Sequence, residues 1–347
     1  MYHANKGPTE SPSVNATMPR VTPERIIETT FAFAQSCALL AAVELDLFTR
    51  IAQGMQTIAM LANDAGVSAN ALGRLLGTVS AMGFLRQSGD DYALTSVSER
   101  FLVRGQPSYV GDIVLQIRQE WDAWIDLTEC VRTGQPTRFI NEEPLGGPFF
   151  APLDASLFPL IHPLMRMICQ RLEIGSRFHG IQVLDLGAGA APSAIATLQL
   201  DADARAVAID FPEALAQAQA YAQKYGVEQR MEYWPANLET IKLPPRRFDL
   251  IFASHVFRIL GVEQTQRLIQ QCFQSLTPGG RLVVVETYND QGVKLFPYIV
   301  SLNMLVNTRQ GNAFTSQQMH EWLSTTGFQV EAWSNVGPDP VLVATCP

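Results

Sequence analysis

The residues of this chain whose types and spacing suit chemistry begin with an acid and a glycine turn. The stretch "VLDLGAGA", residues 183–190, carries Asp185, Gly187 and Gly189 at the end of a hydrophobic run, and an alanine-rich segment follows. This order is typical of a strand, a tight turn and a helix whose N-terminus faces a ligand. A later apolar run ends at Asp210, whose carboxylate is placed to take the ribose hydroxyls of an adenosine.

The glycine turn also discriminates between two cofactor classes. Dinucleotide enzymes favour a third glycine, which lets helix and strand pack closely, and Pro192 occupies that position here. Sulfonium cofactors derived from methionine need the ribose acid and an open glycine turn, but no pyrophosphate cradle. Together with the later segments "FDLIFASHV" and "LTPGGRLVVVE", the turn favours the sulfonium class.

Side chains that commonly bind metal ions are scattered along the sequence. The five cysteines are far apart and never form a CxxC pair, which predicts reduced, mostly buried thiols in a cytoplasmic protein. No group of His, Asp, Glu or Cys has metal-ligand spacing. We therefore expect a reaction that needs no divalent cation.

The elements that must position these residues alternate between strands and helices from Gly180 onward. Such alternation predicts an α/β domain with a Rossmann-like, doubly wound, mostly parallel sheet that binds its ligand at the carboxyl ends of the strands. The expected strands are Ile181–Leu186, Arg205–Asp210, Met231–Pro235, Phe248–Ser254, Gly280–Glu286, Gln329–Ser334 and Pro340–Ala344.

The first third of the chain has a different pattern. Residues 23–42 predict a helix that is apolar nearly all round, and a second subunit is its expected cover. Two helices separated by a turn at Ala65-Gly66, followed by a short hairpin at residues 84–94, predict an otherwise all-helical winged-helix domain. The second helix has Arg74 as its only basic residue between Ser68 and Met82, so we expect dimerisation rather than DNA binding.

Composition and charge limit the partners further. The net charge of −8 and the isoelectric point near 5.2 argue against nucleic acid as a ligand. No apolar run reaches the roughly 18 residues of a membrane span, and the opening residues lack the apolar core of a signal peptide. We expect a disordered leader (1–20), a winged-helix dimerisation domain (21–105), a helical linker and pocket-lining region (106–178) and a cofactor-binding domain (179–347).

From about residue 23 to the end, the chain resembles a bacterial member of the small-molecule O-methyltransferase family, the group that includes plant phenylpropanoid and acetylserotonin methyltransferases. The resemblance is carried by the motifs "ELDLF", "GRLLGTVSAMGFL", the glycine turn, "DFP", "LTPGG" and "SLNMLVNTRQGNAFT" followed by "TGF". It implies a class I fold, a homodimer formed by the N-terminal domain, and S-adenosylmethionine (SAM) as cofactor, with S-adenosylhomocysteine (SAH) as product.

The resemblance also implies where the cofactor binds. Gly187 and Gly189 would wrap the methionine part, and Asp210 would hold the ribose. Asn237 stands where the family usually has Asp, and an amide can still bond the adenine amino group. The full set of expected cofactor-binding residues is Asp185, Gly187, Gly189, Asp210, Phe211, Asn237, Leu238 and Ser254.

The catalytic position departs from the family. The plant members have a histidine base where "HVFRILGVEQ" places Arg258, and arginine stays protonated in proteins. Arg258 would instead bind a substrate carboxylate, stabilise a phenolate or enolate, or pair with an acid such as Glu263 or Glu286. His255 and His162 are the alternative bases, and Glu286 matches an acid that lies near the catalytic residue in many relatives.

The late segment should close the acceptor pocket, and aromatic side chains should form its walls. The expected substrate-binding residues are Trp121, Trp124, Phe149, Phe158, Met304 and Asn307. The sequence thus predicts metal-independent methyl transfer from SAM to a small aromatic or polyketide-like metabolite, most often at oxygen. Three alternatives stay open. The acceptor atom could be carbon or nitrogen. The enzyme could instead carry out pericyclic, decarboxylative or hydroxylating chemistry beside an unreacted cofactor, or the protein could be a regulator that senses SAM.

Overall fold

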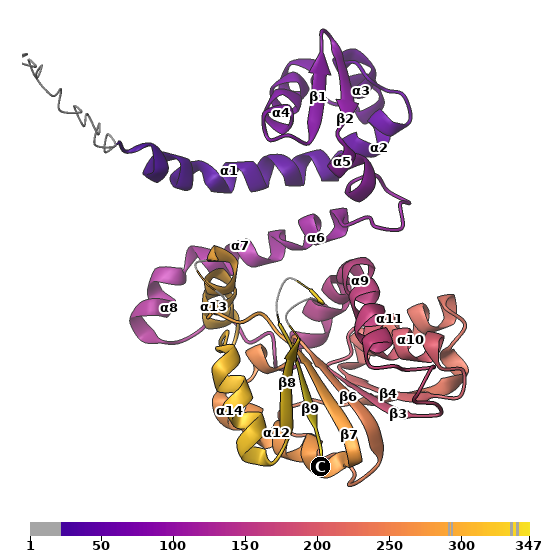
Figure 1. Ribbon diagram of the computed structural model, residues 1–347. Helices are drawn as coiled ribbons and strands as arrows, with labels where there is room; N and C mark the ends of the chain where they lie inside the picture. Colours follow the sequence, from indigo (N-terminus) through magenta and orange to yellow (C-terminus); the bar gives the residue numbers. More distant parts are fainter. Residues whose placement is uncertain (1–21, 291, 293, 334–335, 338–339) are drawn as a thin grey trace, which may run out of the picture.

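The computed structural model describes residues 22–290, 292, 294–333, 336–337 and 340–347. The expected leader at residues 1–20 and the expected strand residue Ser334 lie outside this part. A helical N-terminal region stands above an α/β region, with three short helices between them (Figure 1).

The N-terminal region is a small helical unit with one β-hairpin. Ser68 caps the second helix of the predicted pair, where its Oγ accepts a hydrogen bond from the Ala71 N–H at 3.4 Å. The predicted hairpin is confirmed, with Leu85 opposite Leu94 in an antiparallel register. The elements are α1 (Glu24–Glu44), α2 (Leu47–Ala52), α3 (Ile58–Ala65), α4 (Ala69–Ala81), β1 (Leu85–Ser88), β2 (Asp91–Leu94) and α5 (Ser96–Phe101).

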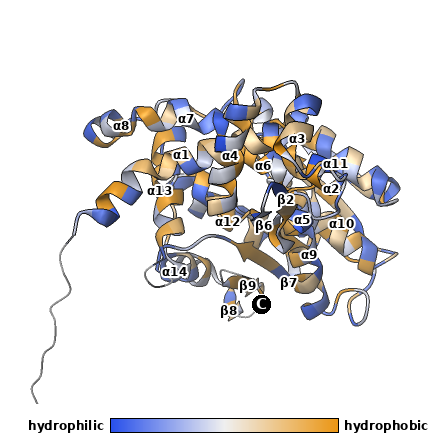
Figure 2. Cartoon of the chain, turned by 90° about the horizontal axis from the view of Figure 1, so that it is seen from above, coloured by the Kyte–Doolittle hydropathy of each residue, from blue (hydrophilic) through white to orange (hydrophobic). Residues whose placement is uncertain are grey.

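Helix α1 corrects one expectation. With a mean hydropathy of 1.6 it is long and apolar enough to cross a membrane by length and composition, because no charged residue falls between Phe31 and Val43. Its first half is uncovered within one chain: Ile26, Phe31 and Phe33 are 72, 61 and 67% exposed. In Figure 2, where the ribbon is coloured by hydropathy, α1 carries many hydrophobic residues. An uncovered apolar face of this kind is what the predicted second subunit would bury.

The connecting region leads into the longest helix of the described chain. Helix α9 (Gly146–Arg171) contains Pro152, Pro159 and Pro163, and it packs against both α10 and α11. This packing places α9 on the side of the sheet that α10 and α11 cover. The shorter helices before it are α6 (Gly111–Gln116), α7 (Arg118–Ile125) and α8 (Leu127–Thr133).

The sheet of the α/β region has seven strands in the order β5-β4-β3-β6-β7-β9-β8. Strands β3 to β7 are parallel and the last two pairings are antiparallel, which confirms the predicted mostly parallel sheet. The strands are β3 (Gln182–Leu186), β4 (Arg205–Asp210), β5 (Met231–Pro235), β6 (Phe248–Ser254), β7 (Leu276–Val285), β8 (Gln329–Trp333) and β9 (Val341–Thr345).

Helices cover both faces of this sheet (Figure 1). One core joins the strands to α9, α10 and α11, and the other joins them to α12 and α14. Strand order reverses beside β3, which opens a crevice at the carboxyl ends of β3, β4 and β6. The remaining helices are α10 (Pro192–Leu200), α11 (Pro212–Lys224), η1 (Glu228–Arg230), η2 (Phe257–Ile259), α12 (Val262–Ser275), α13 (Leu295–Asn307) and α14 (Ser316–Thr326).

Candidate active site

The glycine turn after β3 has the conformation that its sequence requires. Gly187 and Gly189 have φ angles of +58° and +54°, a region that side chains rarely adopt. A Cβ atom on Gly187 would lie 2.7 Å from Val256 Cγ2, so a larger residue would also displace the segment after β6. Helix α10 begins directly after the turn at Pro192, a residue suited to a first helical position.

Two buried acids flank this turn. Asp185 accepts the Ala194 N–H at 2.9 Å, and burial raises the pKa of its carboxyl to about 7. Asp210 accepts the N–H groups of Gly189 at 2.8 Å and Phe211 at 2.7 Å, and burial raises its pKa to about 6. Both carboxylates therefore ionise reluctantly in this environment.

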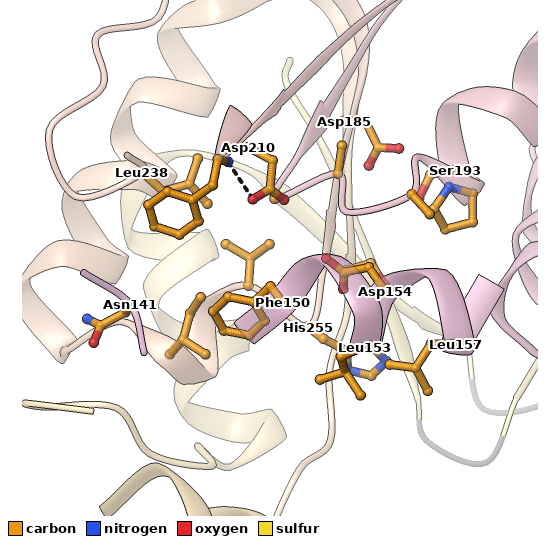
Figure 3. A pocket seen from close by; sticks show the side chains of 18 of the residues that line it. Asn141, Phe150, Leu153, Asp154, Leu157, Asp185, Ser193, Asp210, Leu238 and His255 are labelled. Atoms are coloured by element: carbon orange, nitrogen blue, oxygen red, sulfur yellow. Dashed lines mark hydrogen bonds between the residues drawn. The ribbon is translucent and has the colours of Figure 1, made fainter. Parts of the chain in front are cut away.

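A single pocket at the carboxyl ends of the strands unites most of the expected cofactor-binding residues (Figure 3). Gly189 is outside its lining but bonds Asp210, which lines it. The Asn237 Oδ1 accepts the Glu239 N–H at 2.8 Å, so its amide is held in a local turn. The expected residues that line the pocket are Asp185, Gly187, Asp210, Phe211, Asn237, Leu238 and Ser254.

Beside this pocket lies a histidine–glutamate pair. His255 lines the pocket and has an unusual positive φ of 57°, a strain of the kind that clusters at functional sites. Its Nδ1 lies 3.9 Å from the Glu286 Oε2, and both atoms are buried without a hydrogen-bond partner. A slight movement, or one bridging water, would join the two side chains.

Arg258 lines the same pocket and affects both members of this pair. Its main-chain N–H donates to Glu286 Oε1 at 3.3 Å. Burial, together with the Arg258 charge, lowers the pKa of His255 to about 3, so its imidazole is neutral. Burial raises the pKa of Glu286 to about 6, although the Arg258 charge works in the opposite direction.

The other expected base lies elsewhere. His162 on α9 is outside the pocket lining, where its Nε2 meets Gln199 Oε1 at 2.9 Å and its ring stacks on Phe158 and Tyr225. Burial lowers its pKa. These contacts satisfy His162 as a core residue, and they leave His255 as the histidine that lines the pocket.

Of the expected acceptor-binding residues, the pocket includes Phe158 alone. Trp124 donates its indole N–H to Asn303 Oδ1 at 2.9 Å, which ties α7 to α13. Met304 is 5% exposed and Asn307 is fully buried. Those outside the pocket lining are Trp121, Trp124, Phe149, Met304 and Asn307.

Helix α9 supplies pocket residues that the sequence analysis missed. Phe150, Leu153, Asp154 and Leu157 line the pocket opposite the glycine turn (Figure 3). One signal was available: Asp154 is the single acidic residue in the apolar run "FFAPLDASLFPL". The pocket residues that surround Asp154 are far away in sequence, so the sequence alone did not predict that its side chain faces the pocket.

Within the described residues, no group of three or more His, Cys, Asp or Glu side chains is arranged to hold a metal ion. The pocket instead offers carboxylates, main-chain groups and apolar walls. This lining suits an organic ligand with both polar and apolar parts.

Comparison with known proteins gives these features a context. The family model of the O-methyltransferase dimerisation domain matches residues 27–104, and a methyltransferase domain model matches residues 183–280. The tetracenomycin polyketide synthesis 8-O-methyl transferase TcmO of Streptomyces glaucescens is 29% identical to the chain, over 94% of this chain and 97% of its own length.

Solved structures share the fold across nearly the whole length. A Nostoc punctiforme protein has a TM-score of 0.85 at 24% identity, covering 94% of this chain and 99% of that one. Human N-acetylserotonin methyltransferase, solved in complex with SAM, has a TM-score of 0.79 at 21% identity, with 94% and 98% covered. Fold and site define a SAM-dependent methyltransferase. The chain combines an O-methyltransferase dimerisation domain with a methyltransferase domain.

Proposed function

We propose that this enzyme transfers the methyl group of SAM to a phenolic hydroxyl of an aromatic, polyketide-like metabolite, without a divalent metal ion. The observation that carries the proposal is one pocket lined by the glycine turn, Asp210 and the His255–Arg258 segment. The likeness to a polyketide 8-O-methyl transferase over nearly the full length supports the acceptor class.

The pocket residues fit the cofactor. Asp210 already accepts two N–H groups, and a diol donates hydrogen bonds of the same kind. The cradle at Gly187 leaves no room for a Cβ, as expected where a ligand approaches the main chain closely. When bound, SAM supplies a methyl group activated by a positively charged sulfur.

Arg258 would act on the acceptor by charge. Since guanidinium keeps its proton, Arg258 is suited to lower the free energy of a phenolate at the pocket, not to remove its proton. Positioning of the acceptor supplies about 7–11 kcal/mol in well-aligned reactions, against roughly 3–5 kcal/mol for a general base. Methyl transfer would therefore tolerate an arginine where the resemblance implies a histidine base.

The His255–Glu286 pair would take the hydroxyl proton. With Nδ1 directed at Glu286, the Nε2 lone pair of the neutral ring is the one left for the pocket. A neutral imidazole of such low pKa is a weak base, so the proton would reach Nε2 only where the Arg258 charge stabilises the phenolate oxygen that forms. The ionised Glu286 would then stabilise the imidazolium, which passes its proton to solvent.

The test is incubation with SAM carrying a trideuterated methyl group and a panel of phenolic polyketide-like compounds. We expect SAH release together with a product that is heavier by one labelled methyl on oxygen, identified by mass spectrometry and NMR. Label on carbon or nitrogen would contradict the proposed acceptor atom. Turnover of an acceptor without transfer of label would overturn methyl transfer altogether.

A further inference from the structure

A carboxylate from α9 points into the pocket without a protein partner. Asp154 lies among apolar residues of α9, and its side chain is directed at the strand ends that carry Asp185 and Asp210 (Figure 3). It makes no hydrogen bond or ion pair with any residue in the described part of the chain. A Cβ on Gly189 would lie 2.6 Å from Asp154 Cγ, so the carboxylate packs directly against the glycine turn.

This position is unfavourable for an acid in the ligand-free protein. Burial, and then the negative charge of Asp210, raise the pKa of Asp154 well above its usual range. The only Lys or Arg among the described lining residues is Arg258, and it forms no ion pair with Asp154. Carboxylates held near one another without a cation are expected where the cation arrives with the ligand.

We propose that Asp154 is a cofactor-binding residue that accepts a hydrogen bond from the ammonium group of the methionine half of SAM. This inference rests on the proposed function. SAM has two cationic groups, the ammonium and the sulfonium, and both belong to its methionine half. A bond between an ammonium and a carboxylate is charge-assisted on both sides, which makes it stronger than a neutral bond.

Asp154 and Asp210 lie on different sides of the pocket and would therefore bind different parts of the cofactor. Asp210, at the end of β4, is the acid expected to hold the ribose, whereas Asp154 comes from α9 and meets Gly189 of the turn. The methionine half is the part expected at that turn. Asp154 would therefore recognise the amino acid portion, and it would not contact the adenosine portion.

The test is calorimetric titration with three ligands: SAM, SAH and 5′-methylthioadenosine, which lacks the amino acid portion. We expect Asp154→Asn to weaken SAM and SAH binding by similar factors, roughly 10- to 100-fold, and to change 5′-methylthioadenosine binding less than about twofold. Asp210→Asn should weaken all three. Asp203→Asn, the same change at an exposed acid outside the pocket, should weaken none.

Three other outcomes would contradict the proposal. Equal weakening of SAH and 5′-methylthioadenosine by Asp154→Asn would place Asp154 on the adenosine portion, and a loss confined to SAM would point to the sulfonium. Unchanged binding of all three ligands would remove Asp154 from the site. Failure of the unaltered protein to bind SAM and SAH would count against the proposed function instead. Because the variant removes an unpaired acid, its ligand-free Tm should not fall, which separates binding loss from misfolding.

Discussion

Arg258 lines the pocket where the sequence resemblance implies a histidine base, and its proposed role has a kinetic signature. Arg258→Ala should lower kcat by about 10²–10³-fold, because one positive charge at the developing phenolate is lost. SAM affinity should change less than about threefold, since the acids and the turn that hold the cofactor stay in place. Single-turnover kinetics and SAM titration measure the two quantities. An unchanged rate would return Arg258 to a purely structural role.

The acid next to His255 predicts a pH dependence. Burial raises the pKa of Glu286 to about 6, so the carboxylate is ionised above that pH and protonated below it. At saturating SAM, kcat should fall about tenfold per unit as the pH drops below 6, because the imidazolium loses its stabilising charge. The pH profile of Glu286→Gln should be low and flat. If kcat of this variant still falls below pH 6, the titrating group would instead be Asp210, whose pKa is also about 6.

The sequence predicted those site residues whose conformation depends mainly on their neighbours in the chain. Gly187 and Asp210 belong to a turn and a strand end whose conformations are dictated by adjacent residues, and both line the pocket. Asp154 and Phe150 reach it from a helix whose orientation depends on packing against α10 and α11. His162 shows the opposite case, since its apolar surroundings and Gln199 become visible only in three dimensions.

At the scale of elements, a buried polar cluster fastens α13 to the helical linker. The Asn307 Nδ2 donates to Glu120 Oε2 at 2.8 Å, and Arg138 Nη2 lies 3.0 Å from the same oxygen. The N–H of Ile140 also donates to the Asn307 carbonyl at 2.9 Å. The segment that sequence motifs predicted to close the pocket is thus held in place by Asn307.

This cluster makes a stability prediction. Arg138→Met should lower the free energy of unfolding by about 2–4 kcal/mol, because Glu120 would keep its charge in a nearly buried position with the Asn307 amide but without its cationic partner. Arg118→Met offers a matched control: its pair with Glu44 at 2.9 Å is exposed, and its loss should cost less than about 1 kcal/mol. Chemical denaturation of both variants measures the difference. Equal, small losses would show that the cluster adds nothing.

At the scale of the molecule, the sequence predicted the sheet well because the strand runs are apolar on both faces and alternate with helices. The uncovered surface of α1 was harder to interpret, since the sequence of an apolar helix is similar whether a protein core, a membrane or a partner chain covers it. The match of residues 27–104 to a dimerisation domain favours a second copy of this chain.

A charge on this surface should prevent assembly. Phe31 is 61% exposed on α1, and Phe31→Asp would place an unpaired carboxylate in the interface. Analytical ultracentrifugation should find a dimer for the unaltered protein and mostly monomer for the variant at micromolar concentration. Val262→Asp, at a residue 48% exposed on α12, should remain dimeric. A dimeric Phe31→Asp protein would place the interface elsewhere.

The measurement that tests the central claim most directly is calorimetric titration of the unaltered protein and Asp210→Ala with SAH. The account predicts low-micromolar binding to the unaltered protein and at least about tenfold weaker binding to the variant, because the ribose loses a charged acceptor. Near-normal affinity of Asp210→Ala, with no loss of fold by circular dichroism, would contradict the assignment of this pocket as the cofactor site.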